Sequence, residues 1–288
     1  MSTDIKFTDF KSDEQPTWCP GCGDFGTMNG IMRALANRGA HPKDTFVVAG
    51  IGCSGKIGTY MGANALHGMH GRALPVATGV KLANPDLEVI AAGGDGDGYS
   101  IGGNHFIHAA RRNVDLTYVV MDNRIYGLTK GQASPTSRYD FETSTTPEGP
   151  KQPPINPLAL ALAAGGSFIA QSFSSDAQRH VEILEAAMEH DGFSLVNTFS
   201  PCVTFNNVDT YEYYKEALVD VGETDYDPTD YDAAVSKILE TDAEYMGVLY
   251  RDPDAESYSD AQDVSGNKSV IEDDWPPAHA HDLVDEFY

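Results

Sequence analysis

The first two hundred or so residues alternate between two hydrophobic periods. Between the short apolar runs, apolar residues recur every three or four positions, which is the spacing of an amphipathic helix. The continuous apolar runs predict buried strands over residues 46–49, 87–92, 116–121, 168–170 and 193–199. The helical spacing predicts helices over residues 27–37, 73–83, 101–113, 156–164 and 177–188. Alternation of this kind predicts an α/β fold with an open, mostly parallel sheet and helices on both faces.

The pattern changes in two places. Residues 130–154 are rich in Ser, Thr and Pro and have no apolar period, and they are too many for a simple connector, so we interpret them as mobile or functional. After residue 210 the sequence predicts two more helices, at 211–221 and 233–239, before an acidic tail at 252–274. We therefore expect a main domain over residues 1–210 and an acidic C-terminal extension over 211–288, in which residues 283–288 are a frayed end.

The charge balance is strongly acidic. The chain has 43 Asp and Glu residues against 19 Lys and Arg, a net charge of −24. Such a chain is unsuited to binding nucleic acid or an anionic membrane. Because the acidic residues are spread over the whole chain, we expect a protein adapted to a high-salt cytoplasm, where the Debye length falls to about 3 Å. Without a signal peptide or a long apolar stretch, the expected location is a reducing cytosol.

Two of the predicted strands end in groups that suit a magnesium-bound diphosphate. Asp95, in a glycine-rich turn, follows the run 87–92, and Asn123 follows the run 116–121. The carboxyl ends of parallel strands are where such sheets bind ligands. Mg²⁺ prefers oxygen ligands from protein and phosphate, and glycines let the backbone approach the diphosphate. A Gly-Asp-Gly sequence alone is more often a plain turn closed by its Asp. The prediction of a magnesium site therefore depends on Asp95 and Asn123 occurring together.

The chain has four cysteines: Cys19, Cys22, Cys53 and Cys202. The Cys-Pro-Gly-Cys sequence is compatible with a redox dithiol, with half of a zinc site or with two unrelated buried thiols. The two distant cysteines do not make a ferredoxin-type run. From spacing alone, zinc and an iron–sulfur cluster remain equally open.

Taken together, the motifs resemble the β subunits of 2-oxoacid:ferredoxin oxidoreductases. They occur in the family's order at residues 18–23, 50–56, 70–75, 94–113, 123–132 and 200–202. The resemblance covers roughly residues 10–210 and implies the diphosphate-binding half of a thiamine-diphosphate fold. The forms that the family motifs take at residues 102–105 and 123–132 are most similar to those of 2-oxoglutarate enzymes, with pyruvate enzymes as the alternative.

The resemblance also implies roles for individual residues. Cys19, Cys22, Cys53 and Cys202 would ligate one [4Fe–4S] cluster. Asp95, the side chain of Asn123 and the backbone carbonyl of Ile125 would hold Mg²⁺. Lys56 would bind the carboxylate of the 2-oxoacid. Without the resemblance, Lys56 would be interpreted as an ordinary surface lysine. The residues implied at the thiamine diphosphate are Ile51, Gly52, Cys53, Ser54, His70, Gly96, Asp97, Gly127 and Leu128.

The function implied is oxidative decarboxylation of a 2-oxoacid, with the acyl group passed to coenzyme A and the electrons to ferredoxin. We find no candidate for the glutamate that activates the cofactor's pyrimidine, so an α subunit should supply it in an αβ or α₂β₂ assembly. Two alternatives belong to other classes: half of a non-redox thiamine enzyme, which would not need four matched cysteines, and a zinc-stabilised binding module without catalysis. A visible absorption spectrum would separate them.

Overall fold

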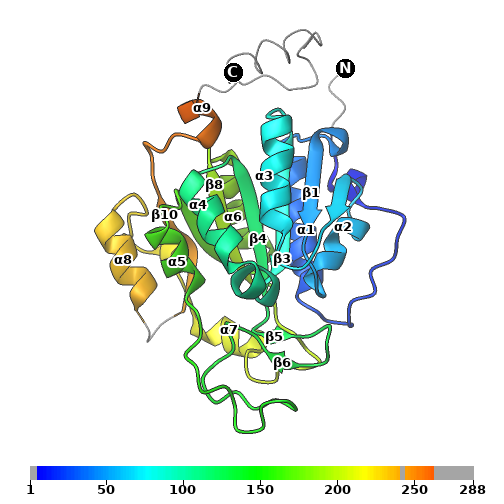
Figure 1. Ribbon diagram of the computed structural model, residues 1–288, viewed down its shortest axis with the longest axis vertical. Helices are drawn as coiled ribbons and strands as arrows, with labels where there is room; N and C mark the ends of the chain where they lie inside the picture. Colours follow the sequence, from blue (N-terminus) through cyan, green and yellow to red (C-terminus); the bar gives the residue numbers. More distant parts are fainter. Residues whose placement is uncertain (1–4, 241–243, 263–288) are drawn as a thin grey trace, which may run out of the picture.

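The computed structural model describes residues 5–240 and 244–262. One sheet of eight strands organises them, in the order β2-β1-β3-β4-β8-β7-β10-β9 (Figure 1). The strands are β1 (Thr45–Ala49), β2 (Asn64–His67), β3 (Glu88–Gly94), β4 (Leu116–Asp122), β7 (Phe168–Phe173), β8 (Phe193–Phe199), β9 (Leu218–Asp220) and β10 (Glu244–Arg251). Neighbours in this sheet are parallel except β10 and β7. The predicted fold class is confirmed.

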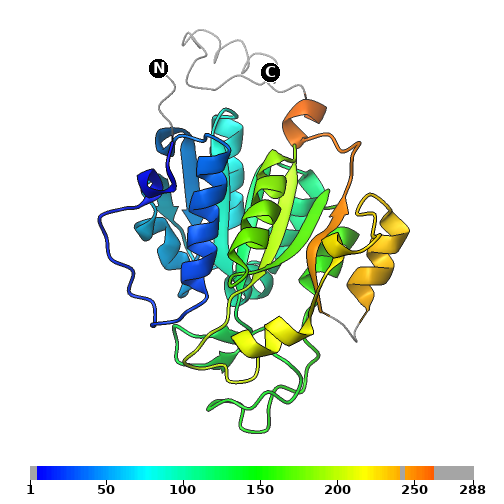
Figure 2. The same cartoon turned by 180° about the vertical axis from the view of Figure 1, so that it is seen from behind.

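Helices cover both faces of the sheet. Figure 1 shows α3, α4 and α5 on one face, and Figure 2 shows α1 and α6 on the other. The buried side chains divide in the same way into two clusters, one on each face. The helices are α1 (Asp24–Asn37), α2 (Ile57–Tyr60), α3 (Ala73–Ala83), α4 (Gly103–Arg112), α5 (Pro157–Ala163), α6 (Ala177–Glu189), α7 (Tyr211–Ala217), α8 (Tyr231–Leu239) and α9 (Tyr258–Gln262).

The central strands explain the continuous apolar runs of the sequence. Every residue of β4 and every residue of β8 is buried. A parallel strand with helices on both faces has no solvent side, so it shows no polar alternation. The predicted strand 193–199 and the predicted helix 73–83 coincide with β8 and α3.

The sequence-based boundaries were wrong at several points. Helix α1 begins at Asp24, three residues before the prediction, and β7 continues to Phe173. The helix predicted over 211–221 ends at Ala217, where the chain enters β9. Strand β10 was missed altogether. The segment expected as an extension thus contributes two strands to the sheet, while the proposed boundary at residue 210 stays a prediction. Residues 263–288, including the predicted frayed end, lie outside the described residues.

The unpatterned segment 130–154 lies at the carboxyl edge of the sheet. Its first strand, β6 (Gln132–Ala133), pairs antiparallel with β5 (Ile125–Tyr126), close to α7 at the bottom of Figure 1. Residues 134–137 then turn back toward the ends of β3 and β4, where the hydroxyl of Thr136 contacts Asp95 and Asp122. The segment therefore takes part in the site and is more than a connector.

A buried histidine between α1 and α6 makes stability depend on pH. His180 is 0% exposed, its Nδ1 lies 3.0 Å from Ser172 Oγ, and a β-carbon at Gly30 would lie 2.3 Å from its ring. Burial lowers the pKa of His180 from 6.5 to about 4. As pH falls from 6.5 toward 4, the unfolded chain binds a proton at this position that the folded chain does not, so stability is lost.

We expect His180→Gln to remove this loss, because glutamine cannot titrate. Between pH 7 and pH 4.5 the unchanged protein should lose roughly 2–3 kcal/mol more stability than the variant. Urea unfolding at the two pH values measures the difference. The exposed His41 provides the control, since His41→Gln should retain the pH dependence of the unchanged protein. Equal losses in the unchanged protein and His180→Gln would contradict the prediction.

Candidate active site

Two buried carboxylates meet at the carboxyl edge of the sheet. The strands β3 and β4 are parallel neighbours, and Gly94 lies opposite Met121. The residues next in sequence to this pair, Asp95 and Asp122, therefore come together. Both are buried, at 2% and 3% exposure. The Oγ1 of Thr136 lies 2.7 Å from Asp95 Oδ2 and 2.8 Å from Asp122 Oδ1. One hydroxyl proton can satisfy only one of these carboxylates at a time.

The electrostatics of this pair favour a cation. Burial, followed by the charge of Asp122, raises the pKa of Asp95 above its ordinary range. Burial also raises the pKa of Asp122, although the nearby Arg124 opposes that shift. Two buried carboxylates that share one hydroxyl are stabilised by an added positive charge. A hard divalent ion with oxygen ligands would supply it, so the residues present fit magnesium.

The turn after β4 holds the other two predicted magnesium ligands. Arg124 has a φ of 56°, a left-handed conformation that reverses the chain between Asn123 and Ile125. The Oδ1 of Asn123 accepts a hydrogen bond of 3.1 Å from the Ile125 N–H. An amide oxygen has a second lone pair, so this contact leaves Asn123 able to ligate an ion. The structure brings these residues to the edge where Asp95 lies.

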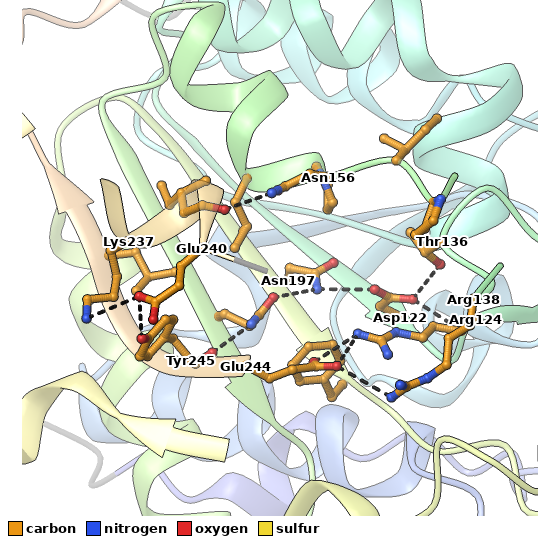
Figure 3. Close-up of a pocket in the computed structure, with 18 residues that line it drawn as sticks. Asp122, Arg124, Thr136, Arg138, Asn156, Asn197, Lys237, Glu240, Glu244 and Tyr245 are labelled. Carbon is orange, nitrogen blue, oxygen red and sulfur yellow. Dashed lines mark hydrogen bonds and ion pairs between the residues drawn. The ribbon is translucent and has the colours of Figure 1, made fainter. Parts of the chain in front are cut away.

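Ion pairs with the C-terminal segment fix this turn, and the sequence analysis missed them. Arg124 Nη1 lies 2.8 Å from Asp209 Oδ1, and Arg124 Nη2 lies 2.9 Å from Glu244 Oε2. Glu244 begins β10, and Arg138 also pairs with Asp209 at 2.7 Å. The cluster borders a cavity of about 360 Å³, which Asp122 and Thr136 also line (Figure 3). Residues 211–251 thus support the site as well as the sheet.

Asp97 connects the loops around the site. Its Oδ1 accepts hydrogen bonds from the backbone N–H of Ile51 at 2.9 Å and of Gly71 at 2.8 Å, and lies 2.6 Å from His70 Nδ1. Its Oδ2 is buried without a partner among the described residues. Asp97 therefore positions Ile51 and His70, and a direct contact of Asp97 with the cofactor stays a prediction. A β-carbon at Gly50 would lie 1.9 Å from Asp97 Oδ2, so glycine is required there.

The remaining predicted contact residues surround the same edge. Ser54 is 5% exposed, and its Oγ lies 3.0 Å from where a β-carbon of Gly94 would be. A β-carbon at Gly96 would lie 2.1 Å from the ring of Tyr126, which explains a glycine at that position. Gly52 adopts a φ of 124°, and Leu128 is 49% exposed. Leu128 is thus open to solvent in the isolated chain.

The four cysteines come from three loops that fold together. A β-carbon at Gly127 would lie 3.6 Å from the sulfur of Cys53 and 3.7 Å from that of Cys202. Burial is the largest cause that raises the pKa of Cys22 far above its ordinary value. The charges of Cys53 and Cys202 raise this pKa further. Burial, and then Asp24, raise the pKa of Cys53 to about 11, with a further contribution from Cys19. All four are free thiols.

These thiols could hold a metal centre by their chemistry. Cys22 and Cys53, whose pKa values are raised, would become thiolate ligands when a metal compensates the charge. Among residues 5–240 and 244–262, no three His, Cys, Asp or Glu side chains are arranged around a single metal ion. Trp18 is buried beside the cysteines, and its indole N–H donates to the carbonyl of Cys53 at 2.6 Å.

Asp24 was missed by the sequence analysis. It is 0% exposed, and its Oδ1 accepts a hydrogen bond of 2.7 Å from Ser200 Oγ. The Gly23 N–H donates to the carbonyl of Pro201 at 3.1 Å. These two contacts join the loop of Cys22 to that of Cys202. Burial raises the pKa of Asp24 to about 6. An acidic residue at the start of a helix is an ordinary sequence feature, so only its burial reveals this role.

Lys56 lies beside the cysteines. Its Nζ donates to Thr17 Oγ1 at 3.1 Å, and its positive charge partly opposes the burial that raises the pKa values of Asp24 and Cys53. The structure therefore places Lys56 near Asp24 and Cys53. A contact of Lys56 with a substrate carboxylate stays a prediction.

Comparisons with known proteins agree with the class that the fold and site define. Residues 45–198 match the family model "Thiamine pyrophosphate enzyme, C-terminal TPP binding domain". Residues 202–265 match the family model for the C-terminal part of the pyruvate ferredoxin oxidoreductase beta subunit. The chain therefore contains a thiamine-diphosphate-binding domain, followed by a segment found in ferredoxin-linked enzymes.

The chain belongs to the β subunits of 2-oxoacid:ferredoxin oxidoreductases. It is 43% identical over 263 residues to 2-oxoacid:ferredoxin oxidoreductase 2, subunit beta, of Aeropyrum pernix, which covers 88% of this chain and 85% of that protein. It is 43% identical over 217 residues to the 2-oxoglutarate synthase subunit KorB of Archaeoglobus fulgidus, covering 73% and 80%.

A solved structure agrees along almost the whole length. The 2-oxoglutarate:ferredoxin oxidoreductase from Magnetococcus marinus, determined with 2-oxoglutarate, coenzyme A and succinyl-CoA bound, superposes with a TM-score of 0.90 at 40% identity. The match covers 98% of this chain and 96% of that one. These comparisons favour this family over the two alternatives from other classes, half of a non-redox thiamine enzyme and a zinc-stabilised binding module. Over the described residues, we find no helix with the length and apolarity needed to span a membrane.

Proposed function

We propose that this chain and an α subunit together convert a 2-oxoacid, preferably 2-oxoglutarate, and coenzyme A into an acyl-CoA and carbon dioxide. The electrons leave through a [4Fe–4S] cluster to ferredoxin. One observation carries the proposal: the turn at Gly127, next to the predicted magnesium ligands, lies against the sulfurs of Cys53 and Cys202. A cofactor site and an electron-accepting site would thus share one turn, which gives a short electron path.

Each group of residues has its own part in this proposal. When bound, thiamine diphosphate supplies the electron sink that decarboxylation of a 2-oxoacid requires. Asp95, with Asn123 and the carbonyl of Ile125, would hold the magnesium of its diphosphate. Asp97 would orient His70, because His70 Nδ1 lies 2.6 Å from Asp97 Oδ1. The other ring nitrogen, Nε2, would then face the cofactor site. Trp18 would shield the cluster from water.

The substrate preference rests on the relatives. The Archaeoglobus protein and the Magnetococcus structure both carry 2-oxoglutarate in their names, whereas the Aeropyrum protein is named for 2-oxoacids in general. We therefore favour 2-oxoglutarate over pyruvate. We also propose a cytoplasmic location and a high-salt environment, which the net charge of −24 supports.

Activity assays with and without the α subunit test the proposal. The αβ complex should reduce methyl viologen with 2-oxoglutarate only when coenzyme A is present, and more slowly with pyruvate. The isolated chain should show no turnover, because it lacks the partner half of the cofactor site. Turnover by this chain alone would refute the two-subunit function, and a complex inactive with every 2-oxoacid would refute the reaction.

We expect Lys56→Ala to raise KM for the 2-oxoacid. A charge-assisted hydrogen bond to a carboxylate contributes about 1.5–3 kcal/mol, which corresponds to roughly ten- to hundredfold in kcat/KM. The exposed Lys43 provides the control, since Lys43→Ala should change kcat/KM by less than about twofold. Thr17→Val removes the hydrogen bond to Lys56 but keeps its charge. If Thr17→Val and Lys56→Ala are equally impaired, Lys56 acts through Thr17 and does not bind the carboxylate.

A further inference from the structure

The two loops that bring three of the cysteines together carry no charge. Residues 16–23 and 198–208 contain no Asp, Glu, Lys or Arg. In a chain with 22% charged residues and a net charge of −24, segments of this combined length would ordinarily carry several charges. The surface over the predicted cluster therefore differs in charge content from the chain as a whole.

These loops form one continuous exposed surface, which we call the uncharged lip. The Gly23 N–H donates to the carbonyl of Pro201 at 3.1 Å, and a β-carbon at Gly21 would lie 3.7 Å from Val203 Cγ1. Val203 is 48% exposed and Phe205 is 37% exposed. The exposed residues of the uncharged lip are Thr17, Cys19, Pro20, Gly21, Val203, Thr204, Phe205, Asn207 and Val208.

Among the described residues, charged side chains border this surface. Phe205 packs against Gly131, where a β-carbon would lie 3.2 Å from its ring, next to the exposed Lys130. On the other side, Glu212 and Lys215 of α7 line a surface hollow together with Cys22. An apolar centre with a mixed, polar rim is the usual anatomy of a protein-binding site.

The uncharged lip also brings the thiols close to solvent. Cys19 is exposed, and Val203 follows Cys202 directly. Electron transfer slows steeply with distance, so an acceptor protein must dock where the cluster lies nearest the surface. At low salt the net charge of −24 would repel an acidic carrier from the chain as a whole. An uncharged apolar window allows such a carrier to approach.

We propose that ferredoxin docks on the uncharged lip, and that apolar contact rather than ion pairing holds it there. This inference rests on the proposed function, because it requires a cluster at the four cysteines. Electron-transfer encounters bury little area, so a patch of this size suffices. Apolar contacts also persist at high salt, where surface ion pairs are screened.

The test uses the αβ complex with a ferredoxin of net negative charge. Val203→Asp places a charge in the centre of the patch and should lower kcat/KM for ferredoxin at least about fivefold. Reduction of methyl viologen, which is small and needs no docking surface, should stay unchanged. Leu82→Asp provides the control: Leu82 is 40% exposed in the last turn of α3, at the opposite edge of the sheet, and its variant should behave as the unchanged complex.

Thr204→Asp gives a second variant, one residue further from Cys202, and should also impair ferredoxin reduction.

For the unchanged complex, kcat/KM for ferredoxin should not fall when KCl is raised from low to molar concentration. A steep fall with salt would overturn apolar docking. Unchanged ferredoxin kinetics in both variants would place the dock elsewhere, and loss of αβ assembly in either would assign the patch to the subunit interface. An unchanged complex that reduces neither acceptor would instead refute the proposed function.

Discussion

Asp95→Asn should bind thiamine diphosphate at least about 100-fold more weakly than the unchanged protein in the presence of magnesium. Magnesium takes few ligands from protein, so each one matters. Substitutions one shell further from a metal already cost 10–100-fold in affinity, and loss of a direct ligand should cost no less. Calorimetric titration with thiamine diphosphate and Mg²⁺, on the αβ complex, measures the effect.

The thermal stability of the same variant distinguishes a lost ligand from a damaged fold. Without metal, Asp95→Asn relieves the repulsion between two buried carboxylates, so Tm should be equal to or higher than that of the unchanged protein. Added thiamine diphosphate and Mg²⁺ should raise Tm of the unchanged protein only, because a ligand stabilises the folded state that binds it.

Asp122→Asn is the matched control for Asp95→Asn. It relieves the same repulsion, and Asp122 shares the hydroxyl of Thr136, but we do not propose it as a magnesium ligand. It should lose about 10-fold and no more than about 100-fold in affinity, the usual cost of losing a residue that supports a metal ligand, and so less than Asp95→Asn. Equal losses in the two variants would mean that both carboxylates bind the ion, and an unchanged affinity in Asp95→Asn would remove Asp95 from the site.

Cys202→Ser should lose most of its iron and sulfide. A [4Fe–4S] cluster needs four thiolates, and the sulfur of Cys202 lies with that of Cys53 against Gly127. The anaerobically purified αβ complex should contain about four iron atoms and four sulfides per β chain, with broad visible absorption near 400 nm. In the variant both the metal content and the absorption should fall by more than about half.

Two comparisons make the cysteine result specific. Asn207→Ser changes an exposed residue of the same loop and should keep the full iron content. Thiamine diphosphate binding should survive in Cys202→Ser, because the magnesium ligands lie on other loops, and its loss would indicate misfolding. A colourless unchanged protein with one bound zinc would overturn the cluster proposal at once.

The sequence by itself determined the class of fold and the main landmarks of the site. Continuous apolar runs and helical spacing are local consequences of which faces are buried, so they located β8 and α3 correctly. Asp95 and Asn123 follow two successive strands of a parallel sheet, and that arrangement alone predicts that they lie at one edge. The motifs gave the family, which the comparisons confirm.

Only the tertiary structure decided how distant segments support these landmarks. Strand β10 escaped the pattern because Gly247 has a φ of 128° and a bulge shifts its register, which interrupts the regular alternation. The contacts of Glu244 with Arg124, of Ser200 with Asp24, and of Thr136 with the two carboxylates join residues 14 to 176 positions apart. Hydrophobic periodicity records which face of an element is buried, but not which residue it meets there, because that depends on the path of the whole chain.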